Sequence, residues 1–197
     1  MSTPRRAVAK PSAPGRPRSE DARRAVLHAV DDMLVEIGYA AMTMKGISER
    51  ARVGRQTVYR WWSTKAEILL EASVQDARGE LATAPNADPT EDLVAYLSAV
   101  TAFLTVSPAG LAYRALLGEA QHDPAVRDLL RDDDPLATAT NAVLDRHRSH
   151  ARAMPDTELA AAQLVGPVVL PILTNGIAIP RSLLTAHAAI LMTAWQG

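Results

Sequence analysis

Residues 43–62 read TMKGISERARVGRQTVYRWW, and this stretch decides the fold of the N-terminal third of the chain. Its apolar residues are spaced so that two short helices can bury a shared seam on either side of a tight turn. Gly54 permits the backbone to change direction after the turn. The residues of the seam are Ile47, Ala51, Val53 and Val58. The spacing therefore predicts a helix-turn-helix.

The second helix of this motif carries many hydrogen-bonding side chains on about two turns. An α-helix has the right width for the major groove of DNA, where Arg pairs with guanine and Gln with adenine through two hydrogen bonds each. A lone exposed arginine is usually a solvated charge, but this motif places several such groups together. The side chains expected to face DNA are Arg55, Gln56, Thr57, Tyr59, Arg60 and Trp61. We expect Trp62 to lie in the core.

The net charge of −1 hides a strong asymmetry along the chain. Residues 1–65 contain 13 Lys and Arg against six Asp and Glu, whereas residues 66–197 contain eight against 16. A basic N-terminal third on an acidic remainder indicates a polyanionic partner at one end and a solvated body at the other. The alternative is a chance excess of arginine in a surface tail.

Residues 1–18 are expected to form a flexible basic arm, because four prolines interrupt any helix and few of the side chains can be buried. The first helix is predicted to start after Ser19, a good N-cap, and to end at Gly38. One face of this helix is apolar and should be buried. Its residues are Val26, Val30, Met33, Leu34 and Ile37.

Further helix starts are marked by capping side chains. Thr43 can cap a second helix, and Thr64 with Glu67 forms a capping box, in which the hydroxyl and the carboxylate each satisfy a free backbone N–H. Other starts pair a capping side chain with a proline at the first helical position. They are Asp88-Pro89, Ser107-Pro108, Asp123-Pro124 and Asp134-Pro135, and two more helices open at Asp156 and Pro180. With no sustained alternating pattern, the prediction is an all-α fold of about nine helices.

Residues 51–69, ARVGRQTVYRWWSTKAEIL, resemble the TetR-family signature, in which a helix-turn-helix ends in Thr-aliphatic-Tyr, an aromatic pair and a lysine that opens the next helix. The resemblance covers residues 19–75 well. Arg52 departs from it, because many members have glycine at this position of the turn, and Gly54 stands where many have serine. The resemblance implies an N-terminal three-helix helix-turn-helix DNA-binding domain and a C-terminal helical domain for ligand binding and dimerisation.

The expected organisation is therefore an arm over residues 1–18, a helix-turn-helix DNA-binding domain over 19–65, and a helical regulatory and dimerisation domain over 66–197. The fourth helix, from Lys65 to about Ala84, is expected to act as the lever between the two domains. One arrangement of the dimer would set the two recognition helices about one DNA turn apart, and a bound ligand would favour another.

The resemblance also implies DNA contacts outside the second helix of the motif. Lys65 would contact a phosphate near the positive end of the fourth helix. Thr43 and Lys45 are also expected to contact DNA. In the arm, residues 14–18 read PGRPR and resemble the Gly-Arg-Pro segments that enter the minor groove. Arg16 and Arg18 are therefore expected contacts; the alternative is a merely solvated tail.

Residues 90–196 resemble, more loosely, the regulatory half of one branch of the same family. The helices within 156–196 are expected to pack against those of a second copy as a four-helix bundle. Pro167 and Pro171 should kink their helix, which would shape a pocket wall or curve a dimer helix. Close approach would come from Ala160, Ala161, Ala162 and Gly166, and buried area from Leu183, Leu184, Ile190 and Leu191.

A ligand cavity is expected in the same half, lined by apolar and aromatic groups with a few polar ones. Its candidate residues, each of which taken singly is more often core packing, are Tyr96, Phe103, Tyr113, Met154, Asn175, Met192 and Trp195. The low aromatic content favours a neutral or lipophilic ligand. The function predicted is a dimeric repressor released from a palindromic operator by an unidentified small-molecule effector. The alternatives are a DNA-binding regulator with no effector and a helical small-molecule-binding protein.

No catalytic residue, metal site or cofactor is predicted. There is no cysteine and no Gly-rich phosphate loop or nucleophile motif. His147 and His150 are three apart, but no third ligand has a convincing spacing, so a solvated face is expected. The first twenty residues lack an apolar signal-peptide core, and the longest uninterrupted apolar candidate, residues 164–173, is too short to span a membrane. A cytoplasmic protein with no membrane partner is expected.

Overall fold

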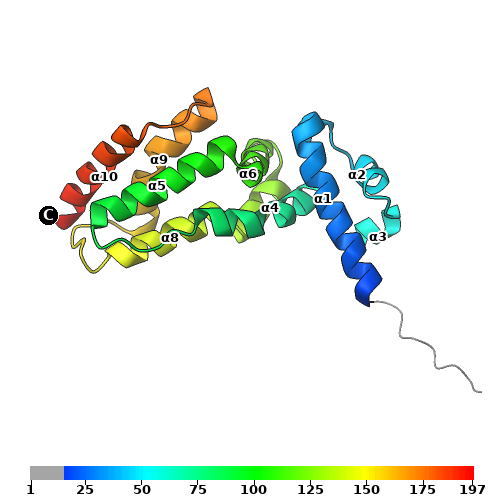
Figure 1. The fold of residues 1–197 in the computed structure, drawn as a ribbon, viewed down its shortest axis with the longest axis horizontal. Coiled ribbons are helices and arrows are strands. Elements are labelled where there is room, and N and C mark those ends of the chain that lie inside the picture. The colour runs from blue at the N-terminus through cyan, green and yellow to red at the C-terminus, as the bar shows by residue number, and fades with distance from the viewer. Residues whose placement is uncertain (1–15) are drawn as a thin grey trace, which may run out of the picture.

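The computed structural model describes residues 16–197, and their side chains from Glu20 onward, as ten helices with no strand in that range (Figure 1). The all-α fold class is confirmed. The part of the expected arm over residues 1–15 lies outside the described residues. The helices are α1 (Arg16–Ala41), α2 (Met44–Arg50), α3 (Arg55–Tyr59), α4 (Lys65–Leu81), α5 (Pro89–Val106), α6 (Pro108–Glu119), α7 (Pro124–Asp132), α8 (Pro135–His147), α9 (Thr157–Asn175) and α10 (Arg181–Gln196).

Helix α1 differs from its expected outline at both ends. It begins at Arg16 rather than after Ser19, so residues 16–18 are helical and do not belong to a flexible arm. Gly38 has a φ of 74° and breaks the regular helix, as expected of a residue that ends one. Ile37 was predicted to be buried, and this is wrong, because it is 50% exposed. The buried face of α1 ends one turn earlier, at Leu34, before the break redirects the chain.

The predicted helix starts are confirmed by their caps. Helices α5 to α8 each begin with proline, and the residue before that proline accepts a hydrogen bond from a backbone N–H of the first turn. Asp156 caps α9 in the same way, through the Leu159 N–H. Each cap satisfies donors that the helix itself leaves free, which is why these starts were readable from local sequence. The capping residues of α5 to α8 are Asp88, Ser107, Asp123 and Asp134.

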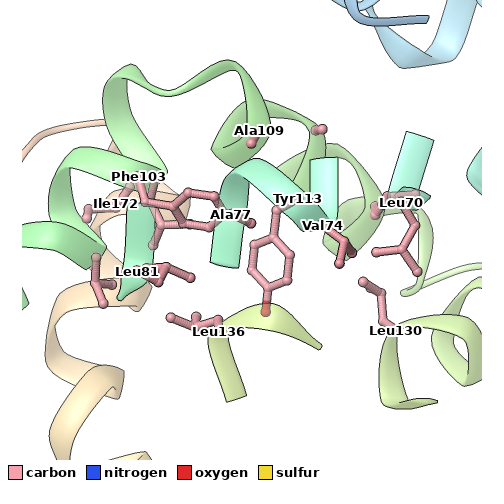
Figure 2. Packing of buried hydrophobic residues seen from close by; sticks show 14 of the residues in the cluster. Leu70, Val74, Ala77, Leu81, Phe103, Ala109, Tyr113, Leu130, Leu136 and Ile172 are labelled. Atoms are coloured by element: carbon pink, nitrogen blue, oxygen red, sulfur yellow. The ribbon is translucent and has the colours of Figure 1, made fainter. Parts of the chain in front are cut away.

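Helix α4 connects the two ends of the molecule (Figure 1). It packs against α1 on the side of the helix-turn-helix and against α6 and α8 on the other side. Figure 2 shows its buried side chains Leu70, Val74, Ala77 and Leu81 in a row, with Tyr113 of α6 beside them. A displacement of α4 therefore has to move or break contacts in both halves of the chain.

Helices α5 and α6 meet at a bend of 78°. Gly110 lies at the inside of this bend, and a Cβ atom added to it would be 1.6 Å from the Phe103 carbonyl oxygen. No side chain fits at that distance from backbone, so the close approach of the two helices requires glycine. The bend holds α6 across α4 and brings Tyr113 against Phe103, with ring centroids 5.8 Å apart.

Helix α9 covers the range expected for it and is apolar along much of its length. It runs for 19 residues through Pro167 and Pro171, so by length and composition alone it could cross a membrane. The uninterrupted apolar stretch expected at residues 164–173 lies within this helix, whose other residues are of mixed polarity. Only 22% of its most apolar 18-residue stretch is buried within the chain, so α9 presents an apolar surface that this protomer does not cover.

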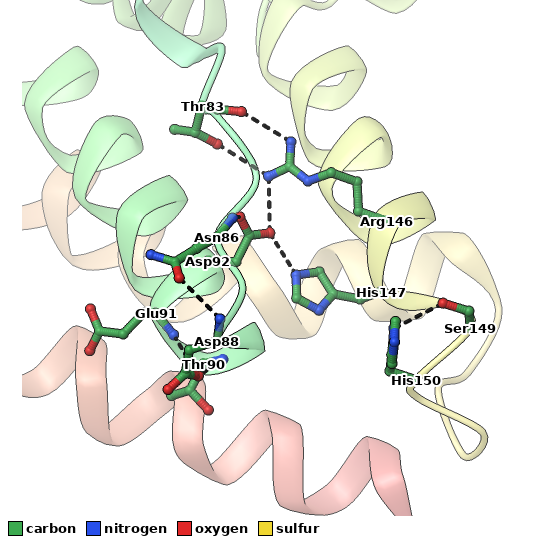
Figure 3. A network of polar contacts seen from close by, with 10 residues as sticks. All are labelled: Thr83, Asn86, Asp88, Thr90, Glu91, Asp92, Arg146, His147, Ser149 and His150. Carbon is green, nitrogen blue, oxygen red and sulfur yellow. Dashed lines mark hydrogen bonds and ion pairs between the residues drawn. The ribbon is translucent and has the colours of Figure 1, made fainter.

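A buried polar network ties the segment between α4 and α5 to helix α8 (Figure 3). The Asp92 carboxylate, 2% exposed, accepts hydrogen bonds from the Asn86 N–H, Arg146 and His147. Burial raises the pKa of Asp92, but these hydrogen bonds outweigh it and lower the pKa below its ordinary value. The expectation that His147 lies on a solvated face is wrong, because its ring is buried against Asp92; His150 is exposed as expected.

Candidate nucleic-acid interface

Helices α2 and α3 pack together through the predicted apolar seam. Ile47 and Val58 are 0% and 1% exposed, and Ala51 and Val53 are partly buried between them. Thr43 caps α2, because its hydroxyl accepts the Gly46 N–H at 3.0 Å. The seam fixes the inner faces of both helices, so the opposite face of α3 is turned to solvent.

The turn between these helices contains a residue in an unfavourable conformation. Arg52 has a φ of 54° and is the only residue besides glycine with positive φ in the described part of the chain. The left-handed conformation costs a non-glycine residue roughly 1 kcal/mol. This explains physically why glycine suits the position, and it means that the turn carries a basic side chain at the cost of some backbone strain.

The solvent face of α3 carries most of the side chains expected to face DNA. Arg55 and Gln56 are exposed, Tyr59 is 54% exposed, and Thr57 is half-buried. Arg55 comes no nearer than 4.0 Å to the Glu49 carboxylate, which is a weak pairing at the surface. The helix is one turn and a half long, shorter than expected, so Arg60 lies at its C-cap.

The two tryptophans that follow α3 have different environments. Trp62 is buried as predicted, and its indole Nε1 donates to Glu71 on α4 at 2.9 Å. Trp61 is half-buried, packs against the core, and meets Trp62 edge-on at 5.4 Å between centroids. The guanidinium of Arg60 lies 5.0 Å from the Trp61 ring centroid. A backbone contact by Trp61 on DNA stays a prediction.

Lys65 has an internal role that the sequence did not reveal. Its ammonium group donates to the carbonyl oxygens of Tyr39 at 2.9 Å and Met42 at 3.2 Å, and it lies 4.1 Å from the Tyr39 ring centroid. These partners hold the end of α1 against the start of α4. The geometry does not favour the expected phosphate contact, because a phosphate would have to compete with three partners of the same ammonium group.

The other side chains expected to contact DNA lie on α2 and at the start of α1. Lys45 is exposed on α2, with its ammonium 3.9 Å from the Glu49 carboxylate. Arg16 and Arg18 lie in the first turn of α1, and their side chains are not described. Entry of these two arginines into a minor groove therefore remains a prediction.

Two ion pairs that were not expected from the sequence connect helices of the DNA-binding half: one joins α2 to α1, and the other joins α1 to α4. Arg50, at the end of α2, donates to Glu36 on α1 at 2.8 Å, and this hydrogen bond lowers the pKa of the Glu36 carboxyl. Arg23, on α1, lies 2.8 Å from the Glu71 carboxylate. The spacing of Asp32 and Glu36, one turn apart on α1, was the available signal for the first clamp, because both carboxylates face Arg50.

Comparison with known protein families agrees with this geometry. The sequence model of "Bacterial regulatory proteins, tetR family" matches residues 26–72, and that of "Tetracyclin repressor-like, C-terminal domain" matches residues 83–191, more than half of the chain. The chain belongs to the TetR family. It is therefore a DNA-binding transcriptional regulator, and the helix-turn-helix described above is its DNA-binding element.

Several transcriptional regulators are similar to this chain over most of their length. The HTH-type transcriptional regulator YdeS of Bacillus subtilis is 30% identical over 82% of this chain and 83% of the relative. The HTH-type transcriptional repressor KstR of Rhodococcus jostii is 30% identical over 77% and 70%. The crystal structure of the TetR-family regulator SCO0332 has a TM-score of 0.72 and 26% identity, covering 88% of this chain and 98% of that one. The fold is also shared with FadR of Bacillus subtilis, crystallised with stearoyl-CoA (TM-score 0.62, 17% identity, 87% and 98% covered).

The candidate ligand residues of this TetR-family chain lie in three places. Tyr96, Phe103 and Tyr113 are buried together between α4, α5, α6 and α8, where Tyr96 Oη lies 2.7 Å from Thr140 Oγ1 (Figure 2 shows Phe103 and Tyr113). Met154, Met192 and Trp195 lie near the end of α10, and Asn175 is exposed at the end of α9. Five cavities found among the described residues are lined by none of these seven side chains. The seven candidate ligand residues therefore do not form one site in this conformation.

The candidate dimer residues of α9 and α10 divide between two faces. Ala160, Leu184 and Leu191 are buried within the protomer. Leu183 and Ile190 are 59% and 66% exposed and lie on the outer face of α10. Other large apolar side chains exposed on α9 and just after it are Leu159, Leu170, Leu173 and Ile177.

Proposed function

We propose that this TetR-family regulator binds a palindromic duplex as a homodimer, with helix α3 in the major groove. The observation that carries the proposal is the division of α3 into two faces: Val58 is buried in the seam, while Arg55 and Gln56 are exposed. Bidentate contacts of these two residue types with guanine and adenine would read sequence. In this proposal Tyr59, Arg60 and Lys45 contact adjacent phosphates.

The proposed dimer forms through the outer faces of α9 and α10, over residues 156–196. The exposed large apolar side chains of α9 and α10 make an apolar surface too extensive to leave in water without a partner. A second copy covers it by two-fold symmetry, and the same symmetry repeats α3 for the second half of a palindrome. In this proposal the exposed apolar surface of α9 serves the dimer rather than a membrane, and the protein acts in the cytoplasm.

The proposed activity is repression that a small-molecule effector relieves. The relative KstR is named a transcriptional repressor, which supports repression by this chain. The structurally similar FadR was crystallised with stearoyl-CoA, which supports a small-molecule effector. An effector acts only if it binds one arrangement of the dimer more tightly than the other. A regulator without an effector is the second candidate, favoured by the tight packing around Tyr96 and Tyr113.

Selection of random duplex DNA by the purified full-length protein tests this proposal. The recovered sequences should share one palindrome, with half-sites about one helical turn apart. Recovery of no common sequence by folded, dimeric protein contradicts the proposal. A thermal-shift screen of small molecules separates the two candidates, because an effector stabilises the state to which it binds.

A further inference from the structure

A cavity of about 640 Å³ lies where the DNA-binding half meets the regulatory half, a volume typical of small-molecule sites. It lies along α4, between α1 on one side and α7 on the other. Arg23 and Leu27 of α1, Trp62 after α3, and Leu129 of α7 all line it. A molecule in this cavity would touch the helix-turn-helix and the regulatory half at once.

The floor of the cavity is apolar, and its charged rim has an excess of carboxylates. Leu27, Leu70, Val74 and Leu129 line it together with the Trp62 ring. Both of its cations already have partners, because Arg23 lies 2.8 Å from Glu71 and Arg78 lies 2.7 Å from Asp133. The two remaining carboxylates that line the cavity belong to Glu67 and Asp132, and neither forms an ion pair within residues 20–197.

A second cavity of about 460 Å³ adjoins the first, since both are lined by Glu67, Leu129 and Asp132. It increases the negative charge of the junction, because its carboxylates outnumber its one cationic side chain, Lys65, even though Asp128 is paired with Arg131. Its other carboxylates are those of Glu119, Asp123 and Asp128. An apolar floor under net negative charge suits a guest with an apolar body and a positive charge.

The contacts that cross this cavity explain how such a guest would act on DNA binding. Glu71 holds both Trp62 and Arg23, and therefore joins the end of α3 and the middle of α1 to α4. A cation bound beside Glu71 competes with Arg23 for the same carboxylate. That competition weakens the connection between α4 and the helix-turn-helix directly at the junction, without a change in the core around Tyr96.

We propose that the junction cavity between α1, α4 and α7 is an effector site for a lipophilic cation, whose binding lowers affinity for the operator. Binding of the cation in this cavity is independent of the proposed function. Only the resulting release of DNA rests on the proposed function. The proposed guest is lipophilic, as expected from composition, and it is also positively charged, because the tertiary structure gathers carboxylates from helices far apart in sequence.

Tetraphenylphosphonium and tetraphenylborate test the chemistry, because they have the same shape and opposite charge. Isothermal titration of the full-length protein should show saturable binding of the phosphonium ion, and at least about tenfold weaker binding of the borate. Fluorescence anisotropy with the selected duplex should show an operator affinity at least about fivefold lower when the phosphonium ion is saturating.

Three variants test the location. Leu129→Trp fills the cavity and should weaken phosphonium binding at least about tenfold, while the duplex is still bound. Asp132→Asn changes an exposed side chain, keeps its shape, and should weaken binding about three- to fivefold, so it tests the site even if Leu129→Trp folds poorly. Ala142→Trp is the matched control, because it enlarges a side chain in a different cavity, between α4 and α8; its phosphonium affinity should equal that of the wild type.

Equal binding of the two ions, or wild-type affinity in both Leu129→Trp and Asp132→Asn, would overturn the proposed site. Phosphonium binding that leaves operator affinity unchanged would overturn its role as an effector site. Failure of the wild-type protein to bind any duplex is a different result, which contradicts the proposed function and not the cavity.

Discussion

The indole Nε1 of Trp62 donates a 2.9 Å hydrogen bond to the Glu71 carboxylate, and Arg23 reaches the same carboxylate at 2.8 Å. One side chain of α4 therefore holds the residue that follows the recognition helix and a residue of the first helix. Because α4 also packs against helices α6 and α8 of the regulatory half, Glu71 joins the helix-turn-helix to a helix that both halves share. We therefore expect a change in the position of α4 to reach α3 through this carboxylate.

Replacement of Glu71 by Ala should lower operator affinity about tenfold and leave the helical content unchanged. The substitution removes a charge-assisted hydrogen bond and an ion pair that orient the helix-turn-helix, and such bonds contribute about 1.5–3 kcal/mol. Anisotropy with the selected duplex and circular dichroism measure the two quantities. Asp76→Ala, on the exposed face of the same helix, serves as the control. Wild-type operator affinity in Glu71→Ala would show that Glu71 does not couple α4 to the helix-turn-helix.

The double variant Arg55→Ala with Gln56→Ala should fold normally and lose discrimination between the operator and random duplex. Both side chains are exposed, so the stability should change by less than about 0.5 kcal/mol. Each lost bidentate base contact should cost about 1–3 kcal/mol of discrimination. Footprinting measures the loss, with Gln75→Ala on α4 as an exposed control. A footprint retained at one palindrome would contradict the assignment of α3 as the reading helix.

Arg52→Gly should raise the free energy of unfolding by about 1 kcal/mol, because glycine adopts the φ of 54° without a steric cost. Arg52→Ala removes the same charge but keeps the conformational cost, so its stability should stay near that of the wild type. Denaturation in urea distinguishes the two variants. Equal stability of Arg52→Gly and Arg52→Ala would mean that the turn is not strained.

Gly110→Ala should destabilise the protein by about 2 kcal/mol or more, because the new methyl group would lie 1.6 Å from the Phe103 carbonyl oxygen. The bend between α5 and α6 would have to open. Gly118→Ala is the matched control in the same helix, where a Cβ meets nothing within 4 Å. It should be neutral or slightly stabilising. Thermal unfolding of both variants checks the contrast, and a tolerated Gly110→Ala would show that the bend can relax.

Leu183→Glu with Ile190→Glu should convert the proposed dimer into monomers and weaken operator binding about 100-fold or more. These side chains are 59% and 66% exposed in the protomer, so the charges should not unfold it. Sedimentation velocity and circular dichroism measure the two properties. Exposed Thr185→Glu and Gln196→Glu, also on α10, test whether any added charge has this effect. A double variant that sediments as the wild type would place the dimer interface elsewhere.

Much of the candidate site was readable from the sequence because its determinants are local. The seam of Ile47 and Val58 follows from helical spacing, and the prominence of Arg55 and Gln56 follows from the opposite face of the same helix. Lys65 shows the limit of such reasoning. Its position at the start of α4 was correct, but its partners are carbonyl groups more than twenty residues earlier in the chain, which no local pattern specifies.

The sequence by itself determined where helices α5 to α9 begin, because a capping side chain satisfies backbone N–H groups only two or three residues away, as Asp88, Ser107 and Asp156 do. It also determined the helix-turn-helix, whose apolar contacts span fewer than 20 residues. Only the tertiary structure decided that Asp92 binds His147 on another helix, and that carboxylates from α4 and α7 gather around one cavity. Such contacts depend on how helices distant in sequence pack, and packing is set by the whole set of buried surfaces rather than by any one segment.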